Sequence, residues 1–216
     1  MADPPKPAHP QEETVESFHR LYYDSMVWRD TYWQGVETQK TPLDLWIYQE
    51  ILFELKPDVI VETGTFDGGS ALYLATICDL MGTGKVITVD LEIRPYRPKH
   101  PRITYVEGYS STSAEAVAKV RTGIGQSQKV MVILDSDHSQ SHVLEELKTY
   151  SGMVTVGQYL IVEDSNINGH PVLEEFGPGP MEALNIFLRE SHNFEIDPSR
   201  EKFYLTFNPR GFLKRR

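Results

Sequence analysis

The feature that most constrains this sequence is the stretch ETGTFDGGS at residues 62–70. An apolar, β-branched run at residues 59–61 precedes it, and an apolar segment at residues 71–78 follows it. This order predicts a strand, a tight glycine-rich loop and a helix. Gly64 and Gly68 let the backbone approach a ligand where a Cβ atom would block it. The stretch therefore predicts a ligand-binding turn at the end of a buried strand.

The spacing of the glycines separates this turn from two common nucleotide-binding motifs. It is not G-x-G-x-x-G, because the glycines stand at 64, 68 and 69, and no Gly-Lys-Ser/Thr of a P-loop follows. Ser70 can cap the helix, whose free N–H groups favour electron-rich ligand atoms. An acid followed by G-x-x-x-G resembles the first motif of class I S-adenosylmethionine-dependent methyltransferases. An ordinary βα turn is the alternative interpretation.

The chain after this turn predicts alternating strands and helices. Residues 85–90 form a second expected strand that ends in Asp90, 26 positions after Gly64. An acid at that place accepts hydrogen bonds from ribose hydroxyls in nucleotide-binding α/β folds. Further strands are expected at 102–108, 129–134 and 158–162, with helices between them. This pattern predicts an α/β fold with a doubly wound, mostly parallel sheet.

The two ends of the chain have patterns of their own. Residues 1–12 are rich in proline and charge and are expected to be a disordered tail. A helix is expected from Thr14 to about Val27, followed by an aromatic segment at 28–35 that would cover the mouth of an acceptor pocket or pack on that helix. Residues 193–196 and 203–207 are expected to form a closing antiparallel strand pair.

Four acids follow two consecutive strands of the expected sheet. Asp135 and Asp137 follow one strand, and Glu163 and Asp164 follow the next. Carboxylates this close repel one another unless a cation or shared protons intervene, and hard oxygen ligands suit Mg²⁺. The alternative is that some of them cap solvated loops. His138 could act as a general base, ligate the metal or be a loop histidine.

Composition limits the class of protein. The formal net charge of −10 over 216 residues disfavours nucleic acid or an anionic membrane as the main partner. Cys78 is the only cysteine, so no intrachain disulfide can form and a reducing cytoplasm is expected. Cys78 is expected to be buried in a helix, and no apolar run suggests a transmembrane segment.

With these features in place, the sequence resembles the cephalosporin hydroxylase-like methyltransferases, a family that includes rhamnosyl O-methyltransferases. The resemblance covers roughly residues 28–213. The stretches that carry it are 33–35, 40–46, 62–70, 134–139, 162–165, 169–171 and 177–180. The resemblance implies a class I methyltransferase fold. Together with the patterns above, we expect a tail at 1–12, a helical and aromatic cap at 13–56 and a methyltransferase domain at 57–216.

The resemblance also assigns roles to individual residues. It implies that S-adenosylmethionine contacts the glycine-rich loop, the second strand end and the loops after the third and fourth strands. The cofactor-binding candidates are Glu62, Gly64, Thr65, Gly68, Ser70, Asp90, Ser110, Ser111 and Asp135. The implied Mg²⁺ ligands are one acid after the fourth strand, Asp135 or Asp137, together with Glu163 and Asp164. Relatives of the catechol type carry a basic lysine near the first acid, where this sequence has His138.

The main hypothesis is a Mg²⁺-dependent O-methyltransferase that acts on a hydroxyl of a small molecule, such as a sugar, a diol, a catechol-like compound or another natural product. His138 or a water would remove the proton. One alternative is an oxidoreductase or hydroxylase, as the family name suggests, and another is a non-catalytic cofactor-binding protein. The sequence leaves open whether the chain forms a homo-oligomer.

Overall fold

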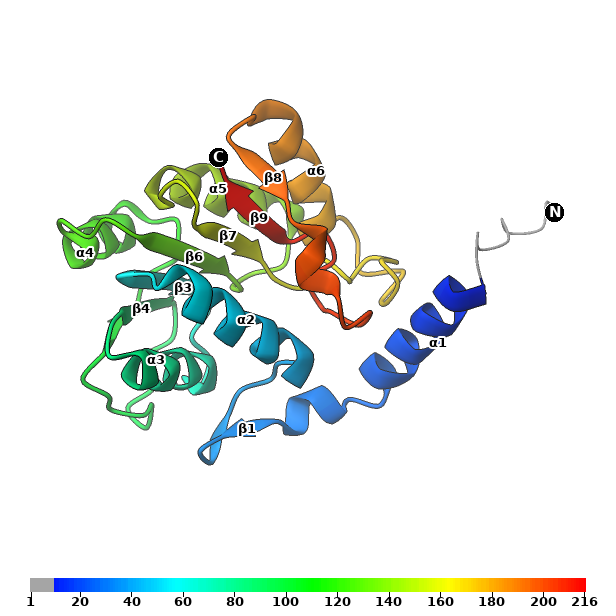
Figure 1. Cartoon of the computed structure of the whole chain (residues 1–216), viewed down its shortest axis with the longest axis horizontal. Coiled ribbons are helices and arrows are strands. Elements are labelled where there is room, and N and C mark those ends of the chain that lie inside the picture. The colour runs from blue at the N-terminus through cyan, green and yellow to red at the C-terminus, as the bar shows by residue number, and fades with distance from the viewer. Residues whose placement is uncertain (1–9) are drawn as a thin grey trace.

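The computed structural model describes residues 10–216, and within them the main sheet has seven strands in the order β5-β4-β3-β6-β7-β9-β8 (Figure 1). The strands are β3 (Val59–Thr63), β4 (Lys85–Asp90), β5 (Ile103–Glu107), β6 (Val130–Leu134), β7 (Tyr159–Val162), β8 (Phe194–Ile196) and β9 (Phe212–Arg215). Strands β3 to β7 are parallel, and β9 is antiparallel to both of its neighbours. The predicted fold class is confirmed.

Helices cover both faces of this sheet. On one face lie α2 (Pro42–Leu55) and α3 (Gly69–Met81), and on the other lie α4 (Ala114–Ile124), α5 (Gln140–Tyr150) and α6 (Pro180–Glu190). Successive residues of a strand point to opposite faces. Val59 and Val61 therefore join the core under α4 to α6, whereas Ile60 joins the core under α2 and α3. Burial on both faces explains why β3 is a continuous apolar run.

Several local signals of the sequence correspond to the observed helix ends. The Thr41 hydroxyl accepts a hydrogen bond from the N–H of Leu43 at the start of α2, and Gly82 ends α3 in a left-handed conformation with φ 71°. Cys78 is fully buried inside α3, as expected. The capping role expected for Ser70 is wrong. Helix α3 begins two residues earlier than that role requires, with Gly68 at the N-cap, so Ser70 lies inside the first turn.

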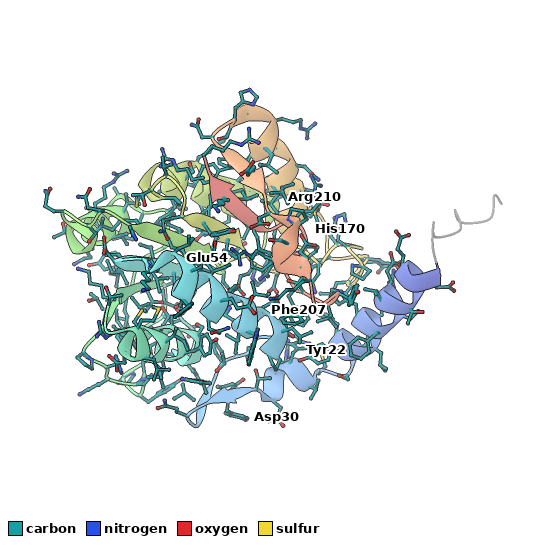
Figure 2. All side chains as sticks on the ribbon, in the orientation of Figure 1. Tyr22, Asp30, Glu54, His170, Phe207 and Arg210 are labelled. Carbon is teal, nitrogen blue, oxygen red and sulfur yellow. The ribbon has the colours of Figure 1, made fainter. Side chains whose placement is uncertain are left out.

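The N-terminal part consists of α1 (Pro10–Asp24), the short 3₁₀ helix η1 (Val27–Asp30) and a hairpin of β1 (Tyr32–Trp33) and β2 (Val36–Glu37). Residues 10–12, expected in the disordered tail, are therefore helical, and residues 1–9 lie outside the described part. Helix α1 extends away from the sheet (Figure 1). Its last turns pack on Phe207, which lies beside Tyr22 in Figure 2.

The prediction of a strand at 203–207 is wrong. The Asp44 carboxylate of α2 accepts hydrogen bonds from the Phe207 N–H at 2.9 Å and the Thr206 hydroxyl at 2.5 Å. Tyr204 has φ 67°, which interrupts an extended conformation. Strand β8 instead pairs with β9, in the basic C-terminal stretch, where Phe212 and Leu213 are fully buried. Two 3₁₀ helices, η2 (Ser151–Met153) and η3 (Pro198–Glu201), lie in connecting segments.

Over residues 10–216, no helix combines the length and the apolar character needed to span a membrane.

Candidate active site

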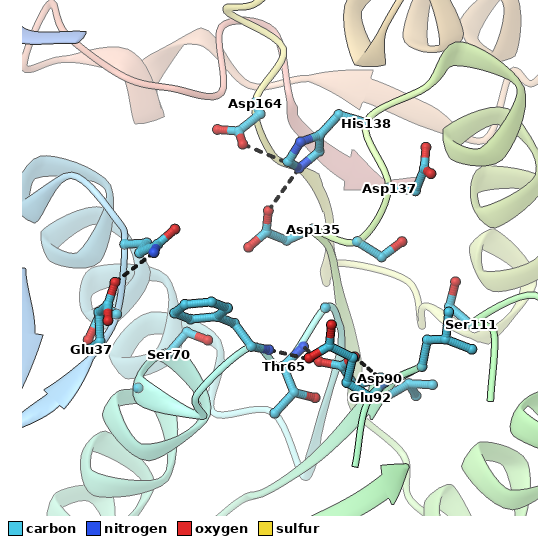
Figure 3. A pocket seen from close by; sticks show the side chains of 18 of the residues that line it. Glu37, Thr65, Ser70, Asp90, Glu92, Ser111, Asp135, Asp137, His138 and Asp164 are labelled. Atoms are coloured by element: carbon cyan, nitrogen blue, oxygen red, sulfur yellow. Dashed lines mark hydrogen bonds and ion pairs between the residues drawn. The ribbon is translucent and has the colours of Figure 1, made fainter. Parts of the chain in front are cut away.

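A cavity of about 830 Å³ opens at the carboxyl ends of β3, β4 and β6. The glycine-rich loop after β3 and the acidic loops after β6 and β7 line it together (Figure 3). Carboxyl ends of parallel strands meet at one edge of a sheet, and ligands of open α/β sheets bind there. Of the cofactor-binding candidates, those that line the cavity are Gly64, Thr65, Ser70, Asp90, Ser110, Ser111 and Asp135.

Gly64 joins the glycine-rich loop to the acidic loop. Its φ is +82°, and a Cβ atom built on it would overlap the backbone carbonyl oxygen of Asp135. The Asp135 N–H in turn donates to the carbonyl of Thr63 at 3.1 Å. The requirement for glycine at this position comes from both the left-handed backbone and the close approach of the next strand's loop.

Asp90 holds the glycine-rich loop in place. Its Oδ2 accepts hydrogen bonds from the N–H groups of Thr65 at 3.0 Å and Phe66 at 2.8 Å, and its Oδ1 accepts from the Glu92 N–H at 2.8 Å. Arg97 adds an ion pair at 2.6 Å. The ribose contact expected for Asp90 stays a prediction, because its carboxylate is already bonded to the protein. Glu92, which the sequence did not single out, lines the cavity beside it.

Glu62 and Gly68 lie behind the wall of the cavity. Glu62 is fully buried, and its Oε2 accepts a hydrogen bond from the Thr88 hydroxyl at 2.7 Å. Its Oε1 has no hydrogen-bond partner among residues 10–216. Burial raises the pKa of Glu62, and the charge of Lys40 opposes that rise. A Cβ on Gly68 would meet Pro98 and Tyr105, so this glycine serves the packing of the loop.

Polar groups also line the part of the cavity after β5, where the adenine of the cofactor is expected. Ser110 is exposed and lines the cavity, while Ser111 is largely buried and its hydroxyl lies 3.0 Å from Nε2 of His142. Both residues line the same cavity as Gly69 and Ser70 at the start of α3. Their contact with a nucleobase stays a prediction.

Asp135, His138 and Asp164 form a compact cluster at the acidic end of the cavity. The Nε2 atom of His138 lies 3.3 Å from Oδ1 of Asp135 and 3.3 Å from Oδ2 of Asp164 (Figure 3). One donor atom from each of the three lies within 4.8 Å of the others. Asp164 has φ 53°, and its N–H donates to Oδ1 of Asn208 at 3.1 Å, which fixes the turn that presents the carboxylate.

The other two candidate ligands lie outside this cluster. Asp137 is exposed, and its Oδ1 accepts a hydrogen bond from the Ser139 N–H at 2.7 Å, as expected for a loop cap (Figure 3). Glu163 is buried and does not line the cavity. The structure thus brings Asp135 and Asp164 together and leaves Asp137 apart from them.

Lys40 is the residue of the site that the sequence analysis missed as a functional group. Its Nζ donates to Oδ2 of Asp135 at 2.5 Å and to Oε2 of Glu163 at 2.6 Å, and only 5% of its side chain is exposed. The other oxygen of Glu163 accepts from the Tyr48 hydroxyl at 2.8 Å. Lys40 directly precedes Thr41, the N-cap of α2, but this position in the sequence does not indicate contacts with acids 95 and 123 positions away.

The protonation of the cluster follows from burial and charge. Burial disfavours the charged ring of His138, but Asp164 and Asp135 outweigh it and raise its pKa to about 9. Burial and the charge of Asp135 raise the pKa of Glu163 to about 8, against the effect of Lys40. Burial also raises the pKa of Asp164, whereas Lys40 and His138 overcome burial and lower the pKa of Asp135. Asp135 is therefore the carboxylate most firmly held in its ionised form.

The donor set fits a hard divalent cation. Two carboxylates that face the same cavity offer the oxygen ligands that Mg²⁺ prefers, and a single imidazole lies beside them. A non-haem iron oxygenase would need two histidines and one carboxylate. In residues 10–216, the cluster has the reverse composition, which argues against the hydroxylase alternative. On the other side of the cavity, the start of α3 has no side-chain cap and fits a ligand with a negatively charged group.

Comparisons with known proteins show the family to which the chain belongs. The family model described as "Rhamnosyl O-methyltransferase/CmcI" matches residues 25–216. A rhamnosyl O-methyltransferase of Mycobacterium leprae (strain TN) is 42% identical over 212 residues, which cover 96% of this chain and 93% of that protein. The rhamnosyl O-methyltransferase of Mycobacterium tuberculosis (strain ATCC 25618 / H37Rv) is 43% identical, with 95% of this chain and 86% of that protein covered.

Solved structures show the same fold. A CmcI structure described with Mg and SAM superposes with a TM-score of 0.68 at 20% identity, over 100% of this chain and 88% of that one. An O-methyltransferase from Bacillus cereus in complex with SAH gives a TM-score of 0.53 at 13% identity, over 88% of this chain and 83% of that one.

Proposed function

The chain belongs to the rhamnosyl O-methyltransferase/CmcI family, and from this membership we propose that it methylates a sugar hydroxyl with Mg²⁺ as cofactor. As a member of the family it is an S-adenosylmethionine-dependent O-methyltransferase. The observation that carries the proposal is the shared cavity. The glycine-rich loop lies at one end of it and the cluster of Asp135, His138 and Asp164 lies at the other.

The cofactor would occupy the side of the cavity formed by the ends of β3 and β4. The uncapped N-terminus of α3 suits the carboxylate of the methionine part, because free N–H groups and the helix dipole favour negative charge. Gly64, Thr65 and Ser70 line this side without a bulky side chain. Ser110 and Ser111 would lie near the adenine, and Asp90 or the neighbouring Glu92 would accept from the ribose hydroxyls.

The metal would bind at the acidic end. Asp135 and Asp164 would hold it, with Glu163 behind them as the third acid expected from the family pattern. When bound, Mg²⁺ lowers the pKa of a coordinated hydroxyl and so favours its reaction with an electrophile. The protein itself would orient the acceptor oxygen, because Lys40 holds the Asp135 carboxylate and the hydrogen bond from the Asp164 N–H to Asn208 fixes the turn that carries the second carboxylate.

His138 would accept the proton of the acceptor hydroxyl. Its Nε2 faces the cavity between the two carboxylates, which stabilise the imidazolium that forms. In the metal-free protein the same carboxylates raise the pKa of His138 to about 9, so the ring carries a proton near neutral pH. The charge of a bound divalent cation would lower that pKa and free Nε2 to act as the base. The acceptor oxygen would form a bond to the sulfonium methyl as the methyl–sulfur bond breaks, which leaves S-adenosylhomocysteine. His138 would return its proton to solvent through the open mouth.

The names of the relatives point to the class of acceptor. Both mycobacterial relatives are rhamnosyl O-methyltransferases, and the alignments extend over most of their length. We therefore assign a hydroxyl of a rhamnosyl group, or of a closely related sugar, as the methylated group. The cap side of the cavity carries Tyr23 and Trp28, with the Arg29 guanidinium 5.1 Å from the Trp28 ring. Aromatic faces of this kind suit a sugar ring.

Two substitutions of equal charge test the metal site. Asp164→Asn keeps a residue that tolerates a left-handed backbone and should lower metal-dependent methyl transfer by about 100-fold or more. Asp137→Asn, in the same cavity, should change it by no more than about threefold. Calorimetry should show that both variants bind S-adenosylmethionine as the wild type does. Undiminished turnover by the Asp164 variant would rule out the metal role.

An acceptor panel tests the substrate class. Purified protein with Mg²⁺ and S-adenosylmethionine should methylate rhamnosides in preference to simple diols and catechols, with the products identified by mass spectrometry. A preference for catechols, with no transfer to any sugar, would contradict the sugar assignment while leaving the methyltransferase class intact.

A further inference from the structure

Lys40 occupies the space between two of the three acids that the family pattern assigns to the metal. It is enclosed behind the cavity wall, and it does not line the cavity that the acceptor would enter. Its Nζ lies 2.5 Å from Oδ2 of Asp135 and 2.6 Å from Oε2 of Glu163. Lys40 is thus the cation that bridges these two carboxylates, in the position where a shared metal ion would otherwise neutralise them.

The charges around Lys40 do not balance. Among residues 10–216, the carboxylates of Glu62, Asp135, Glu163 and Asp164 surround the site, and the cations beside them are Lys40 and His138. Buried carboxylates are costly unless paired. If all four carboxylates were ionised, they would exceed the two cations by two charges. Burial and this mutual repulsion raise the pKa values of Glu62, Glu163 and Asp164, and a divalent cation would relieve both. The arrangement also means that an incoming cation meets an ammonium that already holds two of its ligands.

We propose that Lys40 is an internal counter-ion that competes with the divalent metal for Asp135 and Glu163, holding the empty site together and yielding Glu163 when the metal binds. This inference rests on the proposed metal-dependent function. It reconciles two observations: Glu163 fits the family pattern of metal ligands, yet both of its oxygens are occupied by Lys40 and Tyr48. Lys40 is a positioning residue, because it reaches the acceptor side only through Asp135.

The competition predicts in which direction the loss of Lys40 changes the affinity for the metal. Removing the ammonium leaves two buried carboxylates unpaired in the metal-free protein, which destabilises that state. The metal-bound state loses a repulsive neighbour instead, because like charges a few ångströms apart disfavour each other. Both changes make metal binding more favourable. Loss of Lys40 should therefore weaken the metal-free fold and strengthen metal affinity together.

The test measures Mn²⁺ binding by the loss of its free electron paramagnetic resonance signal, without S-adenosylmethionine or acceptor. Lys40→Met should bind Mn²⁺ about tenfold or more tightly than the wild type. Lys40→Arg keeps the charge and should stay within about threefold of the wild type, as should Lys85→Met, which removes an exposed lysine at the far end of β4. In EDTA, Lys40→Met should lower the Tm by roughly 10 °C, and Mn²⁺ should recover more than half of the loss.

The possible Mn²⁺ binding results distinguish the competition by Lys40 from the metal site itself. If Lys40→Met binds Mn²⁺ no more tightly than the wild type, Lys40 does not compete with the metal. The metal site itself would still be upheld in that case if Mn²⁺ binding by the wild type depends on Asp164. Absence of Mn²⁺ binding in both proteins would overturn the metal role and this inference with it. If Lys40→Met does not fold, Lys40→Gln, an uncharged hydrogen-bond donor, gives the same comparison and must also bind more tightly.

Discussion

At the scale of single residues, Gly64 shows most directly how the backbone constrains the site. Its backbone approaches the Asp135 carbonyl so closely that a side chain has no room. Gly35, in the turn between β1 and β2, has the same φ of +82° but no atom within 4 Å of a Cβ placed on it. A comparison of alanine substitutions at these two glycines therefore separates two contributions to stability: the strain of the left-handed backbone and the overlap with the Asp135 carbonyl.

Gly64→Ala should therefore destabilise the fold by about 3 kcal/mol or more, since overpacking adds to backbone strain. Gly35→Ala should cost only about 1 kcal/mol, from the strain alone. Urea unfolding of the two variants measures both values. Equal losses would mean that the contact between Gly64 and Asp135 relaxes freely. Metal binding should also weaken in Gly64→Ala but not in Gly35→Ala, because the Asp135 loop must move.

At the scale of elements, α2 connects the active site to the C-terminal segment. Asp44 on this helix is buried and accepts hydrogen bonds from Thr206 and Phe207. Tyr48, one turn later, donates to Glu163 and accepts from the side-chain N–H of Asn208 at 2.9 Å. The segment that the sequence predicted to be a strand is held instead by polar groups of this helix.

Asp44 makes the stability of this connection depend on pH. Burial raises the pKa of Asp44 from 3.8 to about 7, against the hydrogen bonds from Thr206 and Phe207. The folded state therefore holds this proton more tightly than the unfolded state. Its contribution to stability is complete below about pH 4 and is lost as pH rises to about 7, by up to roughly 4 kcal/mol.

Asp44→Asn cannot titrate and should flatten the dependence of the unfolding free energy on pH between 4 and 7. Asp79→Asn is the control, because ion pairing with Arg102 lowers the pKa of this exposed carboxyl below that window. Denaturant unfolding across the pH range gives the slopes. A slope in Asp44→Asn as steep as that of the wild type would show that other groups cause it.

At the scale of the whole molecule, an aromatic cluster around Phe207 joins α1 and η1 to the sheet domain. Four rings from α1 and η1 lie with their centroids within 6.0 Å of the Phe207 centroid, and they belong to His19, Tyr22, Tyr23 and Trp28. Tyr23 and Trp28 also line the cavity. The proposed acceptor side is therefore built partly from a segment that is less enclosed than the sheet.

Phe207→Ala should loosen α1 without affecting the central strands. Hydrogen exchange of α1 amides should accelerate by about tenfold or more, because removal of a buried ring costs several kcal/mol, while β3 and β6 amides keep their protection. Tyr204→Ala, at a residue that is 78% exposed, should change neither. Equal acceleration in β6 would mean that the cap and the sheet open as one unit.

The sequence predicts local patterns well and contacts between distant residues poorly. The runs at 130–134 and 159–162 are apolar because those strands are buried on both faces, and Asp135 and Asp164 after them come together because parallel strands end at one edge. Lys40 gives no such signal, since its partners are set by the path of the whole cap. Strand β9 was missed because only Phe212 and Leu213 are apolar in a stretch of basic residues.

The contact between Gly64 and Asp135 also has a consequence for the order in which ligands bind. One loop belongs to the proposed cofactor side and the other to the proposed metal side, and the two backbones touch with no space between them. A ligand that shifts either loop changes the free energy of the other. By reciprocity, if S-adenosylmethionine alters the affinity for the cation, the cation alters the affinity for S-adenosylmethionine by the same factor. The two ligands would then act as heterotropic effectors of each other within a single subunit.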